Sequence, residues 1–123
     1  MAVVSQIHAA LAQSIVIYFL VLSVWALVTH FRAGRLSGSF WGTAIIGELL
    51  FVGQAILGTA LLLEGRAPVH IVHVLYGATG VLVLPFTYGY LPRYRERESV
   101  IVGVVCLFLF GIALRAIDSA RWV

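Results

Sequence analysis

Hydrophobic residues form long runs along the chain, and short polar segments separate these runs. The runs lie at about residues 4–29, 40–63, 69–90 and 100–117, and each is close to the roughly 20 residues that a membrane-crossing helix needs. The second polar segment is so short that its flanking helices must be antiparallel neighbours. Because backbone polar groups in lipid must be paired internally, the pattern predicts an all-α membrane protein, a four-transmembrane-helix bundle of up-down-up-down topology.

The composition supports a membrane protein and excludes several other classes. Hydrophobic residues make up 62% of the chain and charged residues 11%, whereas a soluble domain has roughly 45–50% apolar and 25% charged residues. The formal net charge of +3 is small and scattered, so no nucleic-acid partner is expected. The one cysteine, Cys106, allows neither a disulfide nor a Cys-based metal site within one chain. We expect a single domain over residues 1–123, with its chemistry in or beside the bilayer.

The arginines predict the orientation, because basic residues favour the cytoplasmic side of a membrane. Five of them fall in the first and third connections and three on the opposite side. The first group is Arg32, Arg35, Arg93, Arg95 and Arg97, and the second is Arg66, Arg115 and Arg121. The sequence therefore predicts insertion in the plasma (inner) membrane with both termini extracytoplasmic.

Two of the four histidines are expected at the same depth. His8 lies about five residues into the first run and His73 about four residues into the third, and these helices run in the same direction in an up-down bundle. At 1.5 Å per residue, both lie roughly 6–8 Å below the same surface. Ionisable groups inside a membrane are costly and indicate function. Two imidazoles facing each other across a bundle are the arrangement that supplies both axial ligands of a haem iron. The pattern therefore predicts haem b bound by His8 and His73.

The residues around the histidines fit this interpretation. Gly77 and Gly80 follow His73 at i+4 and i+7 on the same helical face, where they leave room for a flat macrocycle. Arg66 and Arg115 lie on the same side of the membrane, and either could pair with a haem propionate.

Two further histidines and one acid need separate interpretation. His70 precedes His73 by three residues and is an alternative ligand or a propionate contact, whereas His30 lies at the other end of the first helix and is interpreted as interfacial. Glu48 lies about two turns into the second helix, where a carboxylate is costly unless it is paired or protonated. It is either a proton or quinone contact, or a protonated carboxyl bonded to Gln54 or to a neighbouring helix.

The stretch from Gln54 and Gly58 through Gly65 and Pro68 to His73 resembles the haem A synthase family. Each half of those proteins is a four-helix bundle with paired histidines. In them a helix with a Gln-x-x-x-Gly pattern leads through a short loop into a helix that bears a haem-ligand His. The resemblance implies a half-length, haem-binding bundle and is equally compatible with a small membrane cytochrome b.

The sequence also departs from that family. The catalytic half of the family has a Glu three residues before the first ligand His and an Arg directly after it, and here these positions are Ser5 and Ala9. The outer-loop cysteines of the family are absent as well. The resemblance therefore supports haem binding and argues against haem A synthesis.

Three functions follow from these observations. The first, which we favour, is a non-catalytic subunit with bis-His haem b that transfers electrons within a larger respiratory or photosynthetic complex. The second is a half-size enzyme like haem A synthase. The third is a structural subunit, or one that binds a chlorophyll-type pigment, without haem. The expected partners are membrane lipid, other membrane subunits or further copies of the chain, and a quinone.

Overall fold

The structure is a computed structural model that describes residues 2–32, 34–65, 72–93 and 95–119. Within these residues there are four α-helices, namely α1 (Ala2–Phe31), α2 (Gly38–Leu63), α3 (Val72–Tyr90) and α4 (Glu98–Ser119). Two short 3-10 turns, η1 (Leu91–Arg93) and η2 (Arg95–Arg97), lie between α3 and α4. The all-α prediction is confirmed for the described residues, and the helices contain the predicted runs except for residues 69–71, which lie outside the described ranges.

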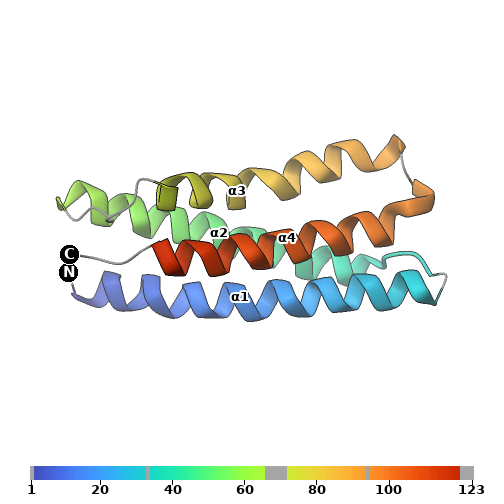
Figure 1. Cartoon of the computed structure of the whole chain (residues 1–123), viewed down its shortest axis with the longest axis horizontal. Coiled ribbons are helices and arrows are strands. Elements are labelled where there is room, and N and C mark those ends of the chain that lie inside the picture. Colours follow the sequence, from blue (N-terminus) through green and yellow to red (C-terminus); the bar gives the residue numbers. More distant parts are fainter. Residues whose placement is uncertain (1, 33, 66–71, 94, 120–123) are drawn as a thin grey trace.

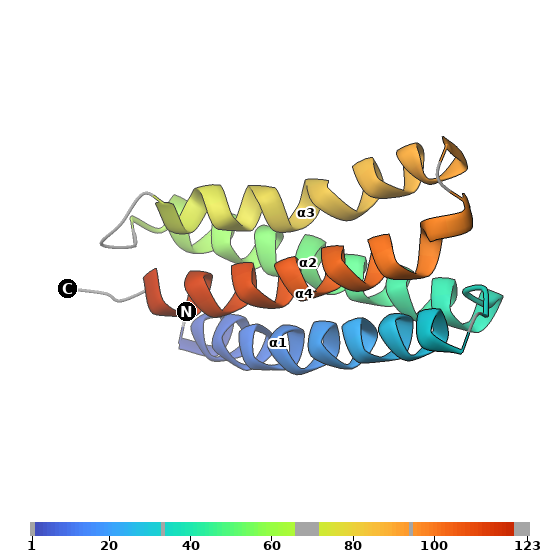
Figure 2. The ribbon, with the colours of Figure 1, turned by 45° about the vertical axis from the view of Figure 1, so that its right-hand side comes forward.

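The helices lie side by side along one long axis (Figures 1 and 2). Helix α1 packs against α2 and α4, and α3 packs against the same two helices. Each helix therefore has two main neighbours, and the order around the bundle follows the order along the chain. The most extensive contact joins α1 and α4, the first and last helices.

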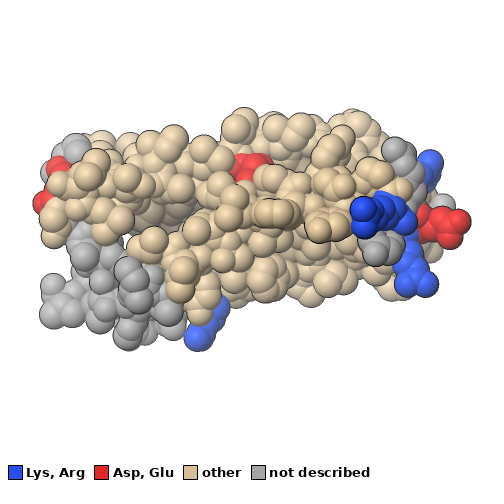
Figure 3. All heavy atoms as spheres, turned by 90° about the horizontal axis from the view of Figure 1, so that it is seen from above, with Lys and Arg blue, Asp and Glu red and all other residues tan. Residues whose placement is uncertain are grey.

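The outer surface of the bundle is apolar along most of its length. By length and composition, each of α1, α2, α3 and α4 could cross a membrane. Large hydrophobic side chains point outward, and Phe86, Leu49 and Ile45 are 64%, 62% and 60% exposed. Most of the charged side chains visible in Figure 3 lie toward the ends of the molecule, and an acidic patch lies between them. An apolar surface of this extent is unusual for a soluble monomer and is consistent with a membrane protein.

Among the described residues, most of the buried hydrophobic side chains form one core cluster. Phe19 and Leu22 of α1 and Val102 and Leu109 of α4 are fully buried, as is Cys106. The hydroxyl of Ser23 donates to the backbone oxygen of Gly103 over 2.9 Å and joins α1 to α4. The core cluster begins at Ile15 on α1, and no described residue before it on this helix is buried. The first turns of α1 therefore border space that the core does not fill.

The ends of α2 are set by local sequence signals. Ser37 is the N-cap, and its side chain accepts a hydrogen bond from the Phe40 amide at 3.2 Å. At the other end, Gly65 has a φ of +84°, which glycine adopts without steric cost, and its amide donates to the Leu62 oxygen at 3.0 Å. The Ser99 hydroxyl donates to the Gly34 oxygen at 3.2 Å and ties the connection before α2 to the start of α4.

Candidate cofactor site

A cavity of about 360 Å³ lies between the helices, at the end of the bundle where α1 begins. This volume is in the range of small-molecule and cofactor pockets, about 300–1,000 Å³. Residues of α1, α2, α3 and α4 line it, and half of the lining residues are Gly, Ala, Ser or Thr. The small lining residues are Ser5, Ala9, Ala12, Ala55, Gly58, Thr59, Gly77, Ala78, Ala113 and Ala116. The cavity exists because these side chains are too short to fill the space between the helices.

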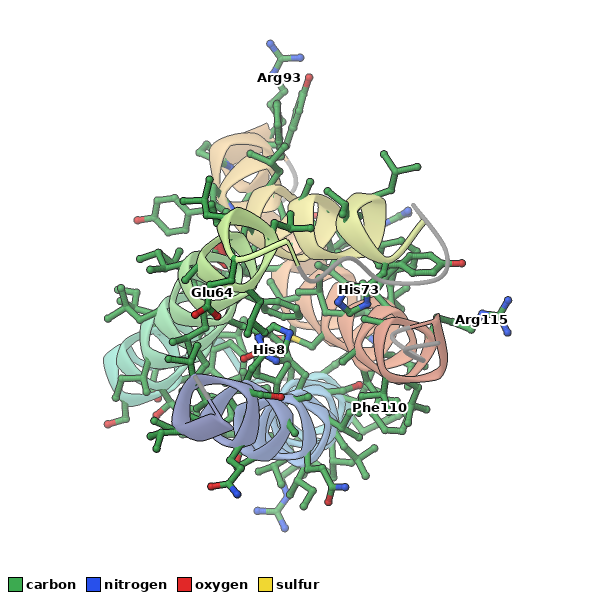
Figure 4. All side chains as sticks on the ribbon, turned by 90° about the vertical axis from the view of Figure 1, so that its left-hand side faces the viewer. His8, Glu64, His73, Arg93, Phe110 and Arg115 are labelled. Atoms are coloured by element: carbon green, nitrogen blue, oxygen red, sulfur yellow. The ribbon has the colours of Figure 1, made fainter. Side chains whose placement is uncertain are left out.

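His8 of α1 and His73 of α3 both line this cavity. Their ring centroids are 6.2 Å apart and the ring planes are inclined by 71°. Viewed along the bundle, both rings point into the space between the helices (Figure 4). The structure thus brings together the two histidines that the sequence places at equal depth, and it places the beginnings of α1 and α3 at the same end of the bundle.

A helix carbonyl orients the His73 ring. Its Nδ1 lies 2.8 Å from the backbone oxygen of Ala116 on α4. A carbonyl oxygen can only accept, so this contact places the proton on Nδ1 and leaves the lone pair of Nε2 available. Histidines that bind metals are commonly held in this way, with the second ring nitrogen donating to a carbonyl or carboxylate. His73 is therefore in the tautomer that a metal ligand requires.

Helix α2 holds His8. The side-chain nitrogen of Gln54 donates to the His8 backbone oxygen at 2.7 Å. A Cβ added at Gly58, one turn further along α2, would lie 3.3 Å from Cε1 of His8, so glycine lets the ring approach this helix closely. His8 is thus fixed through its backbone, while its ring Nδ1 is buried and has no hydrogen-bond partner among the described residues.

The spacing of the two rings suits a metal ion between them. An imidazole nitrogen binds a first-row metal over about 2 Å, so two imidazoles that shared one ion would have ring centroids up to about 6 Å apart. His8 and His73 would hold such an ion, each through one ring nitrogen. No group of three or more His, Cys, Asp or Glu that could hold a metal occurs among the described residues. The pair by itself therefore supplies at most two nitrogen ligands, and a bound metal would need its other ligands from a further group.

Gly77 and Gly80, which are predicted to leave room for a macrocycle, have different surroundings. Gly77 lines the cavity, and no described atom lies within 4 Å of a Cβ built there. Gly80 is buried beneath the ring of Phe51, where an added Cβ would collide with the ring. Gly77 therefore leaves space for a ligand, whereas the space beside Gly80 is taken by the core.

The predicted propionate partners do not gather at the cavity in the described part of the chain. Arg115 is exposed on α4, and its side chain points away from the bundle (Figure 4). Arg66 and His70 lie outside the described residues. Their predicted roles stay predictions.

Glu48 lies on α2 away from the cavity lining. Both of its carboxylate oxygens are buried without a hydrogen-bond partner in the described residues. The Gln54 side chain, considered above as its partner, bonds to His8 instead. His30, the histidine interpreted as interfacial, is exposed at the far end of α1.

Three contributors were not predicted to contact the histidines, although two of them, Gln54 and Gly58, belong to the pattern that carries the family resemblance. Their i, i+4 spacing places both on one face of α2, but it does not show which helix that face meets. The third contributor is the carbonyl of Ala116, which no side-chain pattern reveals.

Comparisons of the chain with protein-family models, with curated proteins and with solved structures find no match. The functional conclusion therefore depends on the geometry of the cavity and its two histidines.

Proposed function

We propose that this protein is an integral membrane subunit that binds one haem b through His8 and His73 and transfers electrons within a larger respiratory or photosynthetic complex. The observation that carries the proposal is the pair of cavity-lining imidazoles with centroids 6.2 Å apart. The Ala116 carbonyl on His73 Nδ1 adds support, because it leaves Nε2 free to bind iron. The small residues around the pair leave room for a macrocycle.

The proposal includes the membrane topology. In it, α1 to α4 cross the inner membrane in alternating directions, with both termini extracytoplasmic. The apolar outer surface supports insertion, since large side chains such as Phe86 and Leu49 are exposed along the bundle. The exposed arginines between α1 and α2 and at the end of α3 support a cytoplasmic location for that end. The haem would then lie near the extracytoplasmic surface.

An electron-transfer role is favoured over an enzymatic one. Ser5 and Ala9 line the cavity at the positions where the haem A synthase family has its Glu and Arg. Neither residue can act as an acid or base or bind a carboxylate as an arginine does. In this proposal, partner subunits or further copies of the chain would supply and accept electrons. A quinol, the reduced form of a quinone, that contacts Glu48 is one such electron donor.

The histidine variants His8→Ala and His73→Ala test the proposal directly. Each is expected to lose the low-spin haem spectrum of the purified protein, because a six-coordinate haem needs both axial ligands. His30→Ala is the matched control, since His30 is an exposed histidine on the same helix as His8, and it should retain about one haem per chain.

Haem content and absorption spectra of the three variants give the readout. Full haem binding with a wild-type spectrum in His8→Ala or His73→Ala would overturn the assignment. A chlorophyll-like pigment that survives His8→Ala would favour the pigment-binding alternative, which needs only one histidine.

A further inference from the structure

We propose that Gln54 is the positioning residue of His8. Its amide nitrogen holds the His8 backbone, and its amide oxygen accepts a hydrogen bond from His8 Nδ1–H, in the tautomer that leaves Nε2 to bind iron. This inference rests on the proposed haem function and names the residue that orients the second axial ligand.

Two unsatisfied buried atoms carry the inference. Within the described ranges, neither Oε1 of Gln54 nor Nδ1 of His8 has a hydrogen-bond partner, and both atoms are buried. One is an acceptor, and the other is a donor as soon as Nε2 uses its lone pair on a metal. Buried polar atoms are costly to leave without a hydrogen bond. A hydrogen bond from His8 Nδ1–H to Gln54 Oε1 would satisfy both atoms.

The two residues are already in contact. The Gln54 nitrogen donates to the His8 backbone oxygen at 2.7 Å, which fixes which end of the amide faces that oxygen. Both residues line the same cavity. This hydrogen bond and the shared lining place the Gln54 amide beside His8, and the pairing of Oε1 with Nδ1 is the step inferred beyond them.

The pairing would complete a symmetric site. His73 Nδ1 already faces the Ala116 carbonyl on α4, and His8 Nδ1 would face an amide oxygen from α2. Acceptors of this kind fix the tautomer of a ligating histidine and raise its basicity, which tunes the metal. Because the acceptor for His8 is a side chain, it can be changed without altering the backbone.

Gln54→Glu and Gln54→Leu test the inference through the midpoint potential of the haem. A carboxylate is a stronger acceptor, so Gln54→Glu should make His8 a better donor, favour ferric iron and lower the potential. Gln54→Leu removes the acceptor and should raise it. A tenfold change in the preference for ferric over ferrous iron corresponds to about 59 mV in each direction. Gln13→Leu, an exposed glutamine on α1, is the control and should leave the potential unchanged.

The opposite shifts of the midpoint potential in Gln54→Glu and Gln54→Leu distinguish a positioning role of Gln54 from a purely structural one. If Gln54 only joins α2 to α1, both variants lose the bond to the His8 backbone and their potentials do not move in opposite directions. Unchanged potentials in haem-loaded Gln54→Glu and Gln54→Leu would overturn the inference and leave the proposed function intact.

A second readout does not need haem. In the haem-free protein, ¹⁵N NMR of the histidine rings should show His8 in the Nδ1–H tautomer, and Gln54→Leu should shift it toward a mixture. An Nε2–H tautomer in the unmodified protein would overturn the inference. A protein that never binds haem but shows this Gln54-dependent tautomer would overturn the proposed function alone.

Discussion

At the scale of single residues, the site depends on small side chains as much as on the histidines. His8 and His73 could be predicted from the sequence because depth follows from residue count along parallel helices. Gln54 and Ala116 could not be assigned in this way. One acts through an amide whose partner lies 46 positions away, and the other acts through its backbone oxygen. Gly77 and Gly80 both follow His73 on one helical face, so the sequence gives them the same role. The structure distinguishes them, because the Phe51 ring occupies the space beside Gly80.

Gly77→Leu should fill the cavity. The position is open in the structure, so the helix and fold are expected to survive, while the haem content falls by at least tenfold because the macrocycle no longer fits. Circular dichroism and haem content of the purified variant measure the two effects. Gly53→Leu on α2 is the matched control, since its position is equally open but does not line the cavity. Normal haem content in Gly77→Leu would place the ligand elsewhere.

Gly80→Ala should destabilise the bundle. A Cβ at this position collides with the Phe51 ring in the core, and overpacking of this kind costs about 1–3 kcal/mol. Thermal unfolding in detergent measures the effect. Gly89→Ala in the same helix has open space around it and should be neutral or slightly stabilising. Equal melting temperatures for the two variants would show that the contact between α3 and Phe51 is not tight.

At the scale of helices, hydropathy predicts the elements well but not their neighbours. The four helices of the described chain contain the predicted apolar runs because membrane-length hydrophobic runs have few alternatives. The extensive packing of α1 on α4 was not predicted, since the contacts join residues about 80 positions apart, such as Ser23 and Gly103. Small residues at the crossing make it possible, because Leu27 lies against Gly103.

Ser23→Ala should weaken the packing of α1 against α4. It removes a buried hydroxyl that donates to the Gly103 oxygen at 2.9 Å, and interhelical hydrogen bonds of this type contribute about 1 kcal/mol. Unfolding in a mixed detergent series measures the loss. In Ser14→Ala, the lost bond is the one from Ser14 to the Ala10 oxygen of the same helix, so little change is expected. A similar small change in Ser23→Ala would show that the bond between the helices contributes no net stability.

At the scale of the whole molecule, the bundle has an apolar outer surface along most of its length and most of its charged side chains toward its two ends. The sequence predicts the orientation only through the positions of its arginines, and some of these, including Arg66, lie outside the described residues. The fold adds that the cavity lies at the end where α1 begins, opposite the connection between α1 and α2. In the proposed function, orientation in the membrane therefore decides from which side the haem would exchange electrons.

Cysteine labelling at the two ends of α2 tests the topology. Leu63→Cys and Gly38→Cys place thiols at its exposed last and first residues, while Cys106 is buried and should not react. A membrane-impermeant maleimide added to spheroplasts should label Leu63→Cys at least tenfold faster than Gly38→Cys. The reverse result would invert the predicted orientation, and equal rapid labelling of both would contradict a membrane-crossing α2.

The most direct test of the central claim is the absorption spectrum of the purified protein, first oxidised and then reduced with dithionite, after expression with ample haem. A haem between His8 and His73 predicts a sharp low-spin b-type α-band on reduction, with about one haem per chain. A colourless protein would contradict haem binding, and a high-spin spectrum would contradict ligation by both histidines.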